Sequence, residues 1–149
     1  MKITRQPAVV RSLRPSNQPY LSGAWTPVAD EVDADDLDVV SGAIPRDLDG
    51  TYFRNAQNQL HEPPGRFHPF DGDGMIHAIT FRDGKARYRN RWVRTQGFNE
   101  EQRAGQSLFG GLMEPPGLAQ RRTRCTHPGL KDASSTDVVV HAGHVLSTY

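Results

Sequence analysis

Cysteine is almost absent from this 149-residue sequence, which contains Cys125 and no other. A single cysteine excludes an internal disulfide and suits a reducing compartment. A catalytic thiol needs an activating base, and the proximity of His127 alone does not supply one. Long apolar runs are also absent: none approaches the ~18 residues of a membrane span, and residues 1–7 lack a signal peptide's apolar segment. We therefore expect a cytoplasmic protein without a transmembrane segment.

An excess of charge of one sign is missing too, because 18 lysines and arginines face 17 aspartates and glutamates. A net charge of +1 provides no overall field to attract nucleic acid or an anionic membrane. The charge that clusters locally is interpreted as solvated surface and not as binding sites. The acidic run comprises Asp30, Glu31, Asp33, Asp35, Asp36 and Asp38, and the basic run comprises Arg121, Arg122 and Arg124.

Apolar residues are scarce at 36%, below the usual share of about 45–50%. Turn-forming residues are plentiful instead, with 14 glycines and 11 prolines. This composition favours turn-rich β structure in one modest domain. Residues 1–27 contain four prolines and little periodicity, so they are predicted to form an extended N-terminal arm.

Alternation of side chains predicts several strands in the rest of the chain. Short strands are expected at 37–42 and 51–54, and a hairpin at 75–94 around Asp83-Gly84, a favoured two-residue turn. The return strand of that hairpin should place Arg87, Arg89 and Arg91 on one face, opposite Tyr88, Asn90 and Trp92.

The C-terminal third predicts a short helix near 99–103 that Gly105 ends, a long surface loop to residue 131, and a second hairpin. That hairpin joins 137–141 to 144–149 around Ala142-Gly143. The chain stops inside the last strand, where an apolar edge would be open, so we expect a truncated sequence. Two hairpins with turn-rich linkers are compatible with propeller blades or with a sandwich.

A family resemblance rests on residues 68–78, which read His-Pro-Phe-Asp-Gly-Asp-Gly-Met-Ile-His-Ala. This segment resembles the motif of the carotenoid oxygenase family, in which Trp is common at the position of Pro69. Three other blocks, at 42–55, 83–95 and 137–146, are similar to further family segments in the same order. Departures occur at 56–59, Ala-Gln-Asn-Gln for the usual Gly-Pro-Asn-Pro, and at 134–136, Ser-Ser-Thr for Ala-Asn-Thr. The resemblance covers roughly residues 20–149.

The resemblance implies an all-β fold: the N-terminal part, about one to two blades, of a seven-bladed β-propeller that follows the arm. Residues 28–149 would then form an incomplete propeller domain. Family members hold Fe(2+) on the propeller axis with four histidines, and imidazole nitrogens suit ferrous iron. The first of these histidines follows the second hairpin in the family. All four are therefore expected downstream of Tyr149, which leaves no catalytic, cofactor-binding or metal residue in this chain.

The implied activity is that of a non-haem Fe(II) dioxygenase, an oxidoreductase that cleaves a conjugated C=C bond with dioxygen. The substrate would be an apolar molecule: a carotenoid, an apocarotenoid or a stilbene. The chain alone is expected to be inactive and, with open strand edges, prone to aggregate. No nucleic-acid partner is expected, and the sequence is compatible with a peripheral membrane contact.

Metal-ligating residue types are nevertheless dense between His61 and His77, where His68, Asp71 and Asp73 also lie. We interpret His68 and the Asp-Gly-Asp-Gly segment as a hydrogen-bonded turn, in which each Asp caps backbone N–H groups and each Gly permits positive φ. An EF-hand is excluded, because the twelfth residue from Asp71 is Arg82 and not Glu.

The remaining histidines receive structural interpretations as well. His77 is expected to be a hydrogen-bonded sheet residue, and His141 and His144 to face solvent beside a turn. His127-Pro128 precedes the second hairpin, whereas the family's first iron motif follows it.

Two rival functions stay open at this stage. A non-catalytic β-rich binding fragment would pair its exposed edges with a partner by strand addition. A small metal-dependent hydrolase would use the His61–His77 region, and zinc lost on His68→Ala substitution would support it.

Overall fold

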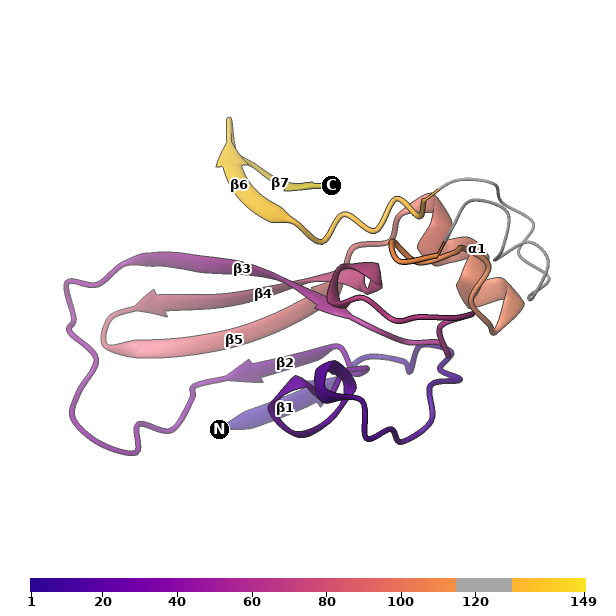
Figure 1. Ribbon diagram of the computed structural model, residues 1–149. Helices are drawn as coiled ribbons and strands as arrows, with labels where there is room; N and C mark the ends of the chain where they lie inside the picture. Colours follow the sequence, from indigo (N-terminus) through magenta and orange to yellow (C-terminus); the bar gives the residue numbers. More distant parts are fainter. Residues whose placement is uncertain (115–129) are drawn as a thin grey trace.

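The computed structural model describes residues 1–114 and 130–149, and its main element is a five-stranded antiparallel sheet (Figure 1). The strand order is β1-β2-β5-β4-β3. The strands are β1 (Lys2–Arg5), β2 (Val32–Asp35), β3 (Gly50–Asn58), β4 (Asp73–Arg82) and β5 (Lys85–Trp92). A separate hairpin, β6 (Asp137–His141) and β7 (His144–Thr148), lies over β3. The helix α1 (Gln96–Ala104) lies at one end of the sheet.

Both predicted hairpins are confirmed. In the β4–β5 turn Asp83 and Gly84 have φ of 51° and 73°, and in the β6–β7 turn Ala142 and Gly143 have φ of 48° and 79°. Two successive positive φ values define a type I′ turn, whose twist matches that of the strands it joins. The short helix is also confirmed, although it begins earlier than predicted. Thr95 accepts a hydrogen bond from Phe98 N at its start, and Gly105, with φ of 67°, ends it.

The strand predicted at 37–42 is wrong, and the strand lies a few residues earlier, inside the acidic run. Asp33 of β2 lies 2.6 Å from both Arg89 Nε and Arg91 Nη2, and Arg87 is 3.8 Å away. The arginines of β5 therefore pair with the acidic segment, which forms the neighbouring strand. Val40, in the segment predicted to be a strand, stays exposed. Tertiary charge pairing overrides the local β propensity here.

The acidic run is accordingly not all solvated surface, contrary to the prediction. Asp33 and Glu31 are buried. The hydrogen bond from Arg91, supported by Arg89, lowers the pKa of Asp33 to about 2. Glu31 accepts hydrogen bonds from Trp92 N (2.8 Å) and Arg94 Nη2 (2.9 Å).

The N-terminal arm is extended but is not separate from the sheet, because its first residues form β1, paired with β2. Farther along, Ser12 N and Leu13 N both donate to Leu60 O at 3.0 Å. Val10 exchanges two hydrogen bonds with Gln102 of α1. The arm thus lies against the residues that follow β3 and against α1. Two 3-10 turns, η1 (Pro19–Leu21) and η2 (Gly23–Trp25), interrupt it.

The apolar core lies at the α1 end of the sheet. It contains Leu60, Met75, Trp92 and Phe98, with the rings of Trp92 and Phe98 5.6 Å apart. Met75 and Trp92 are cross-strand partners on β4 and β5, so the packing follows directly from the register. Each helix in the described part of the chain is too short or too polar to traverse a membrane.

Candidate functional site

The residues between His61 and His77 do not converge on one point. His61 is buried after β3, with Nδ1 3.0 Å from Ser12 Oγ. His77 lies in β4, with Nδ1 2.6 Å from Tyr88 Oη. Burial lowers the pKa of both histidines, which favours their neutral forms. Each ring is thus engaged in its own hydrogen bond, and the hydrogen-bonded role predicted for His77 is confirmed.

His68 and Asp71 form the hydrogen-bonded turn that the sequence predicts. His68 is the N-cap of the 3-10 helix η3 (Pro69–Asp71): its Nδ1 accepts from Phe70 N (3.2 Å), while its own N–H donates to Asp71 Oδ2 (2.8 Å). Asp71 Oδ1 also accepts from Leu112 N at 2.8 Å. The Asp71 carboxylate therefore connects this turn to the segment after α1.

The two glycines of this segment have a different role from the predicted one. Gly72 has φ of −73°, and Gly74 is not in the positive-φ region either. A Cβ atom at Gly72 would lie 2.9 Å from Asn58 N, and one at Gly74 would collide with Ser134 O. Glycine is required here by the close approach of neighbouring backbones, not by an unusual φ.

Asp73, the second carboxylate of the motif, belongs to a buried group of three charges. Lys131 Nζ lies 2.5 Å from both Asp73 Oδ1 and Glu101 Oε2, and all three side chains are at most 9% exposed. Lys131 Nζ is thus the one cation that both carboxylates share among the described residues. Burial raises the pKa of Asp73 to about 6, against the opposing effect of Lys131.

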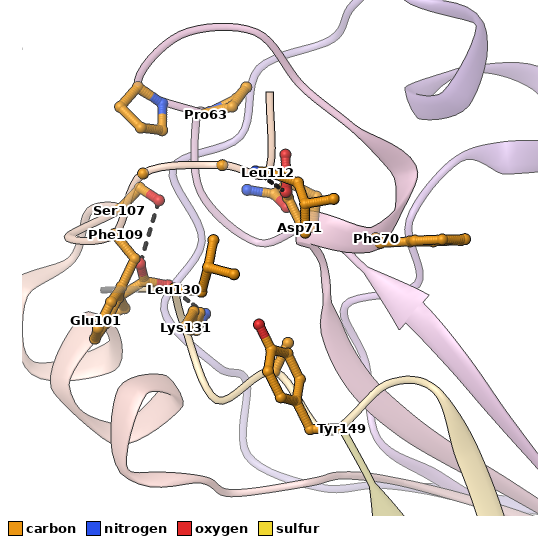
Figure 2. A pocket seen from close by; sticks show the side chains of 15 residues that line it. Pro63, Phe70, Asp71, Glu101, Ser107, Phe109, Leu112, Leu130, Lys131 and Tyr149 are labelled. Carbon is orange, nitrogen blue, oxygen red and sulfur yellow. Dashed lines mark hydrogen bonds and ion pairs between the residues drawn. The ribbon is translucent and has the colours of Figure 1, made fainter. Parts of the chain in front are cut away.

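Beside these charges lies a small hollow that opens to solvent (Figure 2). Its lining combines Asp71, Glu101 and Lys131 with apolar and aromatic side chains. The latter include Phe70, Phe109, Leu112, Leu130 and Tyr149. The hollow lies between η3, α1 and the segment 130–149, which contributes Leu130 from its start and Tyr149 from its end.

Sequence reasoning missed Lys131 and Glu101, which are 30 residues apart. No local pattern marks either of them, because their pairing depends on how α1 packs against the sheet. His141 and His144 are exposed beside the β6–β7 turn, as predicted. Cys125, His127 and the basic run at 121–124 lie outside the described residues.

The described residues do not form a metal centre. Among residues 1–114 and 130–149, no three His, Cys, Asp or Glu side chains are grouped so as to hold a metal ion. Several potential ligands have other partners: hydroxyls for His61 and His77, backbone N–H groups for His68 and Asp71, and Lys131 for Asp73 and Glu101. The described side chains therefore do not fit the iron that the resemblance implies.

Comparison with known proteins shows what this chain is similar to. The profile of the family described as retinal pigment epithelial membrane protein matches residues 25–149. A carotenoid cleavage oxygenase of Mycobacterium tuberculosis is 42% identical over 89% of the chain. An isoeugenol monooxygenase of Pseudomonas nitroreducens is 37% identical over 88%. The chain spans 24% and 26% of the lengths of these two relatives.

Solved structures give the same result for the fold. The lignostilbene dioxygenase of Pseudomonas brassicacearum superposes with a TM-score of 0.76 at 28% identity, over 90% of this chain and 27% of that one. A cobalt-substituted apocarotenoid oxygenase of Synechocystis has a TM-score of 0.65 at 37% identity, over 80% and 25%. These neighbours are seven-bladed propeller oxygenases. The predicted fold class is therefore confirmed: the chain has the fold of the N-terminal part of such a propeller.

Proposed function

The chain belongs to the carotenoid oxygenase family, and from that premise we propose that the protein to which it contributes oxidatively cleaves a conjugated carbon–carbon double bond. The supporting observation is the family match over residues 25–149 together with the superposition on a lignostilbene dioxygenase. The substrate class is a carotenoid, an apocarotenoid or a stilbene, and dioxygen is the co-substrate. We also propose a cytoplasmic location, because a single cysteine suits a reducing compartment.

Fe(2+) is the proposed cofactor, and it would supply the activation of dioxygen. Because His61, His68 and His77 are each hydrogen-bonded within the fold, and His141 and His144 lie exposed beside a turn, we propose that four iron-binding histidines follow Tyr149 in the complete protein. The role of this chain is then structural. The β1–β5 sheet forms a blade, and the β6–β7 hairpin leads from that blade toward the remainder of the propeller.

The experiment compares the full gene product with the 149-residue chain. Each is incubated with ferrous iron, dioxygen and a panel containing a carotenoid, an apocarotenoid, a lignostilbene and isoeugenol. Carbonyl products are then identified by mass spectrometry. We expect cleavage by the full product alone. Cleavage by the 149-residue chain would contradict the scaffold role, and a full product inactive on the whole panel would contradict the proposed activity.

A second candidate function, non-catalytic binding, is favoured by one observation. One face of the β6–β7 hairpin exposes apolar side chains, with the cross-strand partners Val140 and Val145 62% and 45% exposed. Such a surface can pair with a partner strand or bury against another protein. Stoichiometric capture of one defined partner by the 149-residue chain, abolished by Val140→Asp, would support this function. Capture unchanged by that substitution would reject it.

A further inference from the structure

The buried group of Asp73, Glu101 and Lys131 carries an unbalanced charge. Two carboxylates share one ammonium group, so the fully ionised group has a net charge of −1. The side chains are 5%, 4% and 9% exposed, which leaves water little access to that charge. An uncompensated buried charge is costly, and a carboxylate in this position gains a proton more readily than one in water.

The surroundings decide which carboxylate takes the proton. Glu101 Oε1 accepts hydrogen bonds from Leu108 N at 2.8 Å and from Ser107 Oγ at 3.2 Å, both of which stabilise its ionised form. Asp73 Oδ1, in contrast, has only the shared ammonium of Lys131 within hydrogen-bonding distance among the described residues. Asp73 is therefore the proton acceptor of the group.

Lys131 connects this group to a segment that leads directly into β6. We call residues 130–134 the strap. Asp132 accepts hydrogen bonds from Gln96 N (3.1 Å) and Gly97 N (3.0 Å) at the start of α1. Ala133 O accepts from Gly74 N at 2.9 Å, next to Asp73 in β4. The strap thus bridges α1 and the sheet, with the three charges between them.

We propose that Asp73, Glu101 and Lys131 form a proton-controlled contact that holds the strap most firmly when Asp73 is protonated and loosens it, with the β6–β7 hairpin, when Asp73 ionises. The inference concerns regulation within the fold and does not depend on the proposed activity.

The direction follows from linkage. The pKa of Asp73 is raised from 3.8 to about 6 when the strap is closed. The closed strap therefore binds a proton more tightly than an open one, in which Asp73 is hydrated. The resulting stabilisation of the closed strap is complete below pH 3.8 and is lost as the pH rises through about 6.

Every charged group that faces Asp73 enters this balance. Lys131 and Asp132 face it from the strap and Glu101 from α1. His61, after β3, interacts with Glu101 and Lys131 and has a pKa lowered by burial, so its titration acts in the opposite direction. Variants of Asp73 itself are needed to separate the two effects.

The test is amide hydrogen exchange of the intact 149-residue chain at about pH 5 and about pH 7.5, corrected for the intrinsic exchange rates. We expect protection of the strap amides to fall about tenfold at the higher pH, since pH 5 lies one unit below the raised pKa of Asp73 and one unit corresponds to a tenfold change. Asp73→Asn keeps the side-chain shape without the titration. Protection of the strap amides in this variant should therefore not show this pH-dependent loss, which we call the step. Asp35→Asn, a half-exposed control, should keep the wild-type step.

A second variant tests the role of the shared ammonium. Glu101→Gln leaves Asp73 and Lys131 as a balanced pair, so the step should move to lower pH. A wild-type strap that is equally protected at both pH values, or an undiminished step in Asp73→Asn, would overturn the proposal.

If the variants do not fold, the pKa of Asp73 can be measured in the wild type by NMR titration of its carboxyl carbon, and this value tests the proposal. A midpoint near 6 supports the proposal, and one near 3.8 overturns it.

Discussion

The two hairpins of this chain share their local design and differ in what surrounds them. Each joins its strands through two residues at positive φ, and each alternates side chains between two faces. In β4 and β5, Met75 and Trp92 are buried against Leu60 and Phe98. In β6 and β7, Val139 and Val145 remain 44% and 45% exposed. Turn and strand chemistry are therefore local properties, whereas burial depends on the neighbours that the fold supplies.

The polar contacts of the two regions also differ in number and burial. The β1–β5 sheet encloses Asp33 and Glu31 and pairs them with four arginines of β5 and its continuation. The hairpin is held to the rest of the described chain by few polar contacts. Asn55 Nδ2 donates to Asp137 O at 3.1 Å, and the hydroxyls of Ser134 and Ser147 lie 2.7 Å apart. We therefore expect the sheet to be the stable unit and the hairpin to open more readily.

The largest expected change in stability comes from replacing a leucine of the sheet region, and the matched leucine of the hairpin serves as its control. Leu60→Ala should lower the free energy of unfolding by about 2 to 5 kcal/mol, because it leaves a cavity in the core. Leu146→Ala, at a half-exposed site in β7, should change it by less than about 0.5 kcal/mol. Urea unfolding of the 149-residue chain at low concentration measures both. Equal losses would refute the contrast between sheet and hairpin.

The charge pairing of the sheet gives the next effect. Asp33→Asn removes the acceptor that three arginines share and should cost about 2 kcal/mol at neutral pH. The pKa of Asp33 lies near 2 in the folded chain against 3.8 ordinarily, so its stabilisation is present above pH 3.8 and is lost as the pH falls through about 2. The difference between variant and wild type should shrink over that range. Asp38→Asn, at an exposed aspartate, serves as the control.

A smaller loss, about 1 to 2 kcal/mol, is expected from Gly74→Ala, because the added methyl group meets Ser134 O and the backbone must shift. Gly65→Ala is the matched control, since its new methyl group would meet only the flexible end of Glu114. Thermal unfolding compares the two variants. An unperturbed Gly74→Ala chain would show that the strap does not pack on β4 as described.

The smallest effect is expected at His61. His61→Gln should cost about 1 kcal/mol at neutral pH, the size of one hydrogen bond. Burial lowers the pKa of His61 below 6.5, so the wild type loses stability as the pH falls through 6.5, and the variant does not. The gap between the two should therefore narrow in acid. A stability difference that widens in acid would contradict this interpretation of the buried ring. An equal pH response of the stability of the exposed His144→Gln control would also contradict it.

Sequence reasoning recovered the features that short segments encode. Asp83-Gly84 and Ala142-Gly143 specify turns by themselves, and the motif at 68–78 carries the family resemblance. It misplaced β2, because the preference of Asp33 for the arginines of β5 depends on residues more than 50 positions away. It also assigned Gly72 and Gly74 to unusual φ values, when the cause is the proximity of Asn58 and Ser134. Long-range packing, which local patterns do not encode, accounts for both errors.

The scaffold role of the described residues is tested most directly by the iron content of the full gene product. Iron is measured in the wild type and in a folded variant with His61, His68 and His77 all replaced by glutamine. We predict about one iron ion per protein in both, because the histidines that suit ferrous iron would lie elsewhere. Loss of iron from the triple variant would contradict this account and would place the metal among the residues described above.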